Sequence, residues 1–140
     1  MVQVAGVVAE HRRRILALLP SAAVCLTGGA LVEDDPDDVD LVALVDDVAA
    51  AAGRLREAYA PLHEGDWRDD WAAFRDPGPP QVDVVVTRPG SEPDARHRRA
   101  WELLAGDPAL LAEYRALKET RERYEERKRA FFERVAATLS

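Results

Sequence analysis

Two stretches decide the fold of this chain: Leu26-Thr-Gly-Gly29 and Asp38-Val-Asp-Leu-Val-Ala-Leu-Val45. The first is the end of a short apolar run that closes on a glycine pair. An acid-rich turn follows, and two aspartates then begin a second apolar run. In a strand, residues i and i+2 face the same way, roughly 6–7 Å apart. The spacing therefore predicts that Asp38 and Asp40 aim two carboxylates at one point.

This pattern indicates a particular chemistry. Hard oxygen ligands so placed suit Mg2+, which favours one or two carboxylates together with substrate phosphates. Glycines allow backbone amides to come close to a phosphate group. We therefore expect Asp38 and Asp40 to be catalytic residues that bind Mg2+ or Mn2+, and Gly28 and Gly29 to contact the β- and γ-phosphates of a bound substrate.

A third carboxylate lies in the β-branched run over residues 81–87, which has the pattern of a buried strand. An ionised carboxylate inside such a strand is costly unless it is paired or bound to a metal. Asp83 is thus the expected third catalytic residue and metal ligand. An alternative interpretation makes Asp38 and Asp40 turn acids and Asp83 a salt-bridged residue at a sheet edge.

The arrangement resembles the nucleotidyltransferase superfamily signature, in which a Gly-Gly or Gly-Ser pair precedes Asp-x-Asp and a later strand supplies a third acid. The resemblance implies metal-assisted nucleotidyl transfer from a nucleoside triphosphate.

Composition limits the other classes of function. A chain of 140 residues with 47% apolar residues fits one globular domain. The net charge of −7 argues against sequence-independent binding of nucleic acid. No apolar run approaches the roughly 20 residues of a membrane span, the N-terminus lacks a signal-peptide pattern, and Cys25 has no partner for a disulfide. We expect a cytoplasmic protein, and the abundance of Ala, Arg, Asp and Val suggests a bacterial source.

The periodicity predicts a single α/β (α+β) domain over residues 1–140, with a sheet core over about 1–90 and C-terminal helices over about 91–140. Strands are expected at 22–27, 39–45 and 82–87, and helices at 2–19, from 46 or 47 to about 60, and from 91–94 to about 106. Residues 62–80 are difficult to assign and could hold a short strand near Trp71. Asp107 and Pro108 restart a long final helix that runs to about 139.

The inward face of that final helix carries cations among apolar residues. Its members at three/four spacing are Leu110, Tyr114, Leu117, Arg121, Tyr124, Lys128, Phe131 and Val135. Cations on a core-facing stripe need an anion or a water-filled cleft, so Lys118, Arg121 and Lys128 are expected to contact substrate phosphates. The alternative is that their stems lie along the core while the charged heads reach solvent.

A closer resemblance is to the C-terminal half of the GrpB family, whose fold is similar to that of nucleotidyltransferases. It rests on Asp83 to Thr87, Trp101-Glu-Leu-Leu, Asp107-Pro108, Tyr114-Arg-Ala-Leu-Lys118, Tyr124, Lys128 and Phe131-Phe132. The front loop departs from the family, which carries a Gly-Ser pair and a Val-Pro-Gly-Leu stretch where this chain has Gly28-Gly29 and a run of acids.

The leading expectation is an Mg2+-dependent nucleotidyltransferase that moves a nucleoside monophosphate from a nucleoside triphosphate to an unidentified small-molecule or protein acceptor. Two alternatives stay open. One is a minimal antitoxin-type nucleotidyltransferase that modifies a partner protein, and the other is a non-catalytic nucleotide-binding module.

Overall fold

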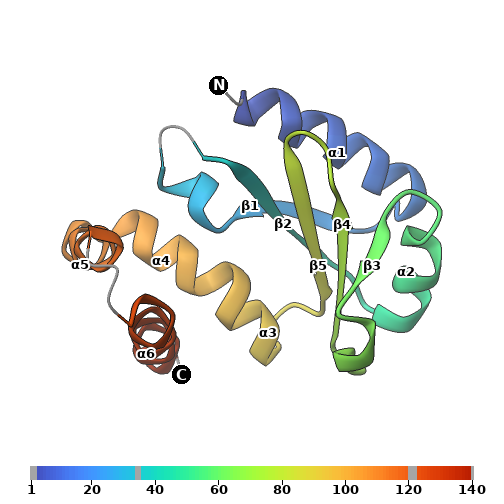
Figure 1. The fold of residues 1–140 in the computed structure, drawn as a ribbon. Coiled ribbons are helices and arrows are strands. Elements are labelled where there is room, and N and C mark those ends of the chain that lie inside the picture. The colour runs from blue at the N-terminus through green and yellow to red at the C-terminus, as the bar shows by residue number, and fades with distance from the viewer. Residues whose placement is uncertain (1–2, 34–35, 120–122, 140) are drawn as a thin grey trace.

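The computed structural model describes residues 3–33, 36–119 and 123–139. Over these residues the chain forms a five-stranded mixed sheet with helices on both of its faces (Figure 1). The strands are β1 (Ala23–Thr27), β2 (Asp38–Leu44), β3 (Ala60–Leu62), β4 (Trp71–Asp76) and β5 (Gln81–Thr87). The helices are α1 (Val4–Leu18), α2 (Val48–Leu55), α3 (Glu92–Asp94), α4 (Ala100–Gly106), α5 (Pro108–Glu119) and α6 (Tyr124–Ala137).

The sheet has the strand order β1-β2-β5-β4-β3, and only the central pair β2 and β5 is parallel. Side chains alternate between its two faces. Val39 and Leu41 of β2, like Val82 and Val84 of β5, are buried in the cluster that packs under α1 and α2. The aspartates between them point to the other face, where no helix covers them as closely.

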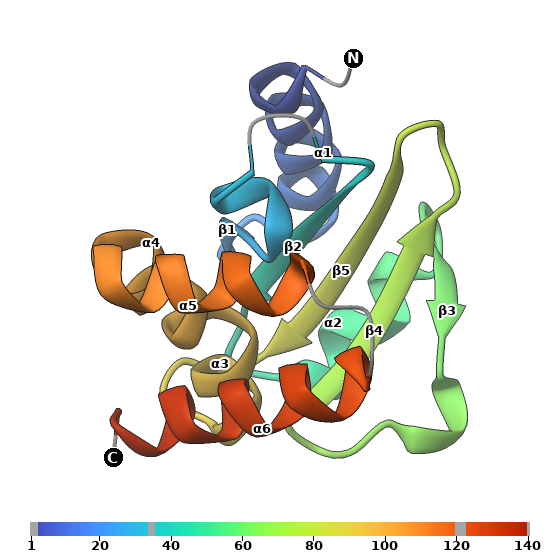
Figure 2. The same ribbon diagram turned by 60° about the vertical axis from the view of Figure 1, so that its left-hand side comes forward.

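A second, smaller hydrophobic cluster holds the C-terminal helices together. Leu104 of α4, Tyr114 and Leu117 of α5, and Phe131 and Val135 of α6 are its main buried members. α5 and α6 lie side by side, on the side of the sheet away from α1 and α2 (Figure 2). The sheet core and the helical cluster thus enclose a space between them.

The ends of the helices follow from identifiable side chains. Asp47 caps α2 by accepting a hydrogen bond from the amide of Ala50 at 3.0 Å. Ser91 caps α3 through the amide of Asp94 at 3.2 Å. Asp107 accepts from the amides of Ala109 and Leu110, with Pro108 in the first helical position, as the sequence predicted.

Two expectations about secondary structure are wrong. The helix predicted to reach residue 60 ends at Leu55, and residues 60–62 form the edge strand β3, where Pro61 is tolerated because it needs no ladder hydrogen bond. The single long final helix is two helices, α5 and α6. Tyr114 packs on the rings of Phe131 and Phe132 at centroid distances of 6.2 and 5.9 Å. A straight helix could not bring these residues together, so the chain reverses, and Arg123 takes a left-handed conformation before α6.

Among the residues described, no helix is both long enough and apolar enough to cross a bilayer.

Candidate functional site

The candidate site is built on one row of side chains across the sheet. Thr27 of β1 is paired with Asp40 of β2, Asp40 with Asp83 of β5, and Asp83 with Arg75 of β4. Residues opposite one another in a ladder project to the same face. The strand register therefore brings two of the three predicted carboxylates next to each other, with Asp38 two residues before Asp40 on the same face.

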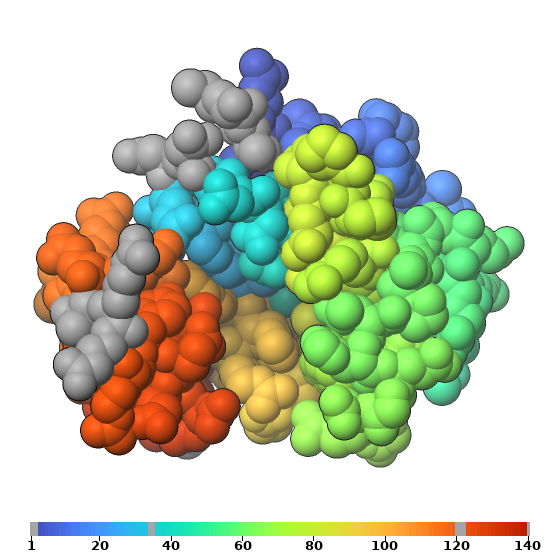
Figure 3. All heavy atoms as spheres, in the orientation of Figure 1, coloured from blue at the N-terminus to red at the C-terminus, as the bar shows by residue number. Residues whose placement is uncertain are grey.

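A cavity of about 1040 Å3 lies over this row. It is hollowed between α6 and the strands of the sheet, as the space-filling view shows (Figure 3). Its lining includes Thr27, Gly28, Asp40 and Asp83 from the sheet side and Lys128, Arg129 and Phe132 from α6. The volume is at the upper end of what small-molecule sites require, so a ligand of nucleotide size fits.

Asp40 is the most perturbed acid of the site. Burial raises its pKa to about 7, and the nearby charges of Asp38 and Asp83 add to the effect, whereas Lys128 and Arg75 oppose it. No hydrogen bond from a described residue reaches its carboxylate. A carboxylate that is desolvated, crowded by other acids and unsatisfied favours a proton or a cation. Asp40 therefore has the properties of a cation-binding or proton-accepting group.

Gly28 lies directly against Asp40. Its φ angle is +69°, which favours glycine, and a Cβ atom placed there would come within 2.5 Å of an Asp40 carboxylate oxygen. Any larger residue at 28 would push the carboxylate aside. Gly29 faces Glu33 instead and does not line the cavity. The expected phosphate contact by Gly29 stays a prediction.

Asp83 is held by a salt bridge. The Arg75 guanidinium donates from Nε to one carboxylate oxygen at 2.7 Å and from Nη2 to the other at 3.0 Å. The alternative interpretation of Asp83 as a salt-bridged residue thus has direct support. Among the described residues no three His, Cys, Asp or Glu side chains come close enough together to hold a metal ion. Asp83 as a third metal ligand stays a prediction, and it requires Arg75 to release the carboxylate.

The cations predicted to contact phosphate from the C-terminal helices do not share one location. Lys128 lines the cavity and lies 5.8 Å from the centre of the Tyr124 ring. Lys118 forms an ion pair with Glu33 and stacks on Tyr114, so it is not part of the cavity wall. Arg121 lies outside the described residues. The expectation of three phosphate contacts rested on one continuous helix, and of the two cations that the structure describes, Lys128 lines the cavity and Lys118 does not.

A π-helical turn over Ala95–Arg99, which was not predicted from the sequence, lies between α3 and α4. Arg96, His97 and Arg99 of this turn line the cavity, while Arg98 turns away to bind both oxygens of Asp94 at 2.6 and 2.8 Å. Thr27 anchors the turn by donating its hydroxyl hydrogen bond to the His97 carbonyl. The basic run Arg96–Arg99 was visible in the sequence, but nothing local indicates the wider turn that directs it inward.

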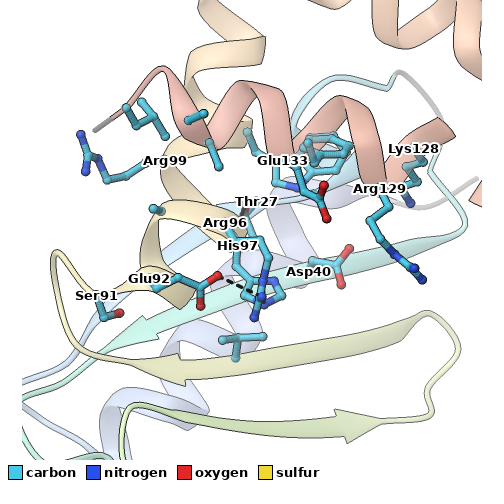
Figure 4. Close-up of a pocket in the computed structure, with 18 of the residues that line it drawn as sticks. Thr27, Asp40, Ser91, Glu92, Arg96, His97, Arg99, Lys128, Arg129 and Glu133 are labelled. Carbon is cyan, nitrogen blue, oxygen red and sulfur yellow. Dashed lines mark hydrogen bonds and ion pairs between the residues drawn. The ribbon is translucent and has the colours of Figure 1, made fainter. Parts of the chain in front are cut away.

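The imidazole of His97 is neutral in this setting, because burial, followed by the positive charge of Arg96, lowers its pKa to about 4. Arg96 itself is balanced by Glu92 at 3.0 Å. Figure 4 shows His97 and Arg96 projecting into the cavity from the turn and Asp40 projecting from β2. The π-helical turn thus contributes an arginine and a neutral imidazole to the cavity, and β2 contributes a carboxylate.

Three cations of the cavity wall stand without a carboxylate partner. Within the described parts of the chain, Arg99, Lys128 and Arg129 form no ion pair, although acids outnumber bases in this protein by 26 to 19. Other arginines of the chain, such as Arg14, Arg56 and Arg134, each form an ion pair with a carboxylate. Lys128 and Arg129 lie together on α6, and Arg99 lies at the other end of the cavity (Figure 4). Unpaired cations in a cleft favour an anionic ligand.

Comparison with known proteins supports the fold. No protein-family model matches the chain, and no curated protein matches it. Among solved structures, the chain is similar to the conserved protein GrpB from Enterococcus faecalis, with a TM-score of 0.76 and 15% sequence identity, over 99% of this chain and 93% of that one. The fold is therefore GrpB-like, as the resemblance in the C-terminal half predicted.

Proposed function

We propose that this protein is a metal-dependent nucleotidyltransferase that binds a nucleoside triphosphate in the cavity and transfers the nucleoside monophosphate to a hydroxyl acceptor. One observation carries the proposal: Asp40, whose pKa is raised to about 7, lies on the same cavity as the unpaired Lys128 and Arg129 (Figure 4). A site with an unsatisfied carboxylate on one wall and free cations on the other suits a metal-bound polyphosphate.

The donor set fits Mg2+ or Mn2+ through two carboxylates. Asp38 and Asp40 would hold the ion, since Asp40 has no hydrogen bond from the described residues and both carboxylates project from the same face of β2. A bound ion of this kind supplies charge stabilisation for the attacking and leaving oxygens of phosphate transfer.

The remaining residues would bind and orient the substrate. Lys128 and Arg129 would contact phosphate oxygens from α6, and Gly28, which has no side chain to displace the Asp40 carboxylate, would lie beside the phosphates. Arg75 would hold Asp83 beside Asp40 through two hydrogen bonds until the metal binds. His97, neutral near pH 7, would accept a hydrogen bond from the acceptor hydroxyl and orient it.

The decisive experiment measures pyrophosphate release. The full chain is incubated with each of the four common ribonucleoside triphosphates, Mg2+ or Mn2+, and pools of candidate acceptors, and pyrophosphate is followed by a coupled assay. Asp40→Asn removes the charge without changing the shape and should lower turnover at least 100-fold. Asp46→Asn removes one exposed charge away from the cavity and should leave it unchanged. Pyrophosphate release that is equal in Asp40→Asn and wild type would refute the proposed site.

A second candidate is a non-catalytic module that binds the nucleotide without turnover. The Arg75–Asp83 salt bridge favours it, because one of the three expected metal ligands is already neutralised. Metal-dependent nucleotide binding with no pyrophosphate release for any acceptor tested would support this candidate over the enzyme.

A further inference from the structure

The face of α6 that lines the cavity changes character along the helix. Glu125 comes first, Lys128 and Arg129 follow, then Phe132 with Glu133 beside it, and Ala136 one turn later. At 1.5 Å per residue, Phe132 lies about 6 Å and Ala136 about 12 Å along the axis from Lys128. A ligand lying along this face would meet two cations flanked by acids at one end and an aromatic and apolar surface at the other.

The aromatic part of this wall is the pair Trp101 and Phe132, which we call the aromatic wall. Their ring centres are 4.7 Å apart with planes at 37°, and Trp101 also packs edge-on against Tyr114 at 5.3 Å. Both rings are only partly buried, unlike Tyr114 and Phe131 in the same cluster. Packing in the cluster holds both rings, and both also line the cavity.

Two small residues also line the cavity. Ala95 comes from the π-helical turn and Ala136 from α6, and neither side chain extends beyond a methyl group. Large aromatic surface exposed in a concave site is characteristic of a binding surface rather than of packing. Flat, rigid rings with free faces stack with the rings of a ligand.

We infer that the aromatic wall of Trp101 and Phe132 is the subsite for the base of the nucleotide, with the phosphates directed towards Lys128 and Arg129. The inference rests on the proposed function, which makes the bound ligand a nucleotide, and it adds the position of the base, which the phosphate contacts alone do not specify. A nucleotide joins a flat aromatic base to its phosphates through a ribose, and this matches the order of surfaces along α6. A simple phosphorylated metabolite would leave the aromatic wall uncovered.

The test compares ligands with and without a base. Calorimetric titration of the full chain with Mg2+ uses the four common ribonucleoside triphosphates and tripolyphosphate, which keeps the three phosphates and lacks the sugar and the base. AMP and ribose 5-phosphate, which differ only in the base, provide a second comparison. We expect the best triphosphate to bind at least about tenfold more tightly than tripolyphosphate, and AMP to bind more tightly than ribose 5-phosphate.

Two neighbouring phenylalanines supply matched variants. Phe132→Leu keeps an apolar side chain and removes a ring of the aromatic wall, so it should reduce the preference for the triphosphate over tripolyphosphate several-fold. Phe131→Leu removes a ring from the same cluster that does not line the cavity, since Phe131 is only 2% exposed. It should lower the melting temperature and leave that preference unchanged. Fluorescence of Trp101 in the Trp67→Phe, Trp71→Phe background should be quenched by ATP and not by tripolyphosphate.

Each result decides a separate question. Equal affinity for tripolyphosphate and all four triphosphates would overturn the base subsite while leaving the phosphate site intact. A base preference that Phe131→Leu abolishes and Phe132→Leu preserves would also overturn it. A base preference that depends on Phe132 but is accompanied by no pyrophosphate release would support the subsite and count against the transfer reaction alone.

Discussion

Removing the charge of Asp40 should stabilise the protein above pH 7. In the folded chain this carboxyl has a pKa of about 7, whereas its ordinary value is 3.8. Between these two pH values the folded state holds a proton that the unfolded state releases. The free energy of unfolding therefore falls as the pH rises through this window, and the loss is complete above it.

The size of the effect follows from the same two values. Each pH unit between them corresponds to about 1.4 kcal/mol, so the ionised Asp40 destabilises the fold by at most about 4 kcal/mol. Solvent that enters the open cavity screens part of the charge, and we expect about 2–4 kcal/mol. Asp40→Asn keeps the shape beside Gly28 and cannot ionise. It should exceed wild type in stability by this amount at pH 8 and by little at pH 4.

The assay is urea unfolding of wild type, Asp40→Asn and Asp46→Asn from pH 4 to pH 8.5 in the absence of divalent cations. Asp46 is exposed and away from the cavity, so its variant controls for the loss of one negative charge. Other groups that titrate in this range, including His97, contribute equally to all three proteins and cancel in the differences. If the free energy of unfolding changes with pH in the same way for wild type and Asp40→Asn, the raised pKa of Asp40 in the folded protein is refuted.

Three further outcomes are expected. Millimolar Mg2+ or Mn2+ should raise the melting temperature of wild type by mass action. The double variant Asp38→Asn, Asp40→Asn should lose most of this rise in the same thermal scan. An equal rise in both proteins would exclude the two aspartates as metal ligands. Lys128→Gln should weaken nucleotide binding about tenfold or more in titrations with Mg2+, whereas Lys118→Gln should not, and a loss confined to Lys118→Gln would reverse this assignment. Arg75→Gln leaves Asp83 without its two guanidinium hydrogen bonds and should lower the free energy of unfolding by about 1–3 kcal/mol, as measured in urea; an unchanged value would mean that the salt bridge contributes nothing.

The strands that carry the site could be predicted because their pattern is local. Alternation of apolar residues and aspartates fixes which side chains of β2 share a face, and the β-branched run of β5 is a strong strand signal. The predicted strands at 22–27, 39–45 and 82–87 agree with β1, β2 and β5 within a residue at each end. Asp40 and Asp83 are neighbours because β2 and β5 pair in the sheet.

The rest of the site depends on contacts that the sequence does not reveal. Arg75 lies eight residues before Asp83, in a segment that could not be assigned, and only the pairing of β4 with β5 brings the two side chains together. The reversal between α5 and α6 carries no proline or glycine, so the helical periodicity appears continuous through it. It is driven by the packing of Tyr114 against Phe131 and Phe132, which are distant in sequence.

The alternation within β2 has a consequence for how this protein can change. Val39 and Leu41, both almost completely buried, are packed under α1 and α2, while Asp38 and Asp40 lie on the opposite face, where Asp40 lines the cavity. Deleting or inserting one residue inside β2 would exchange the two sets, placing a carboxylate in the hydrophobic core and a valine in the cavity. The packing of β2 in the core therefore fixes which of its side chains face the cavity. A one-residue change in the length of this strand would disrupt the hydrophobic core and the cavity together.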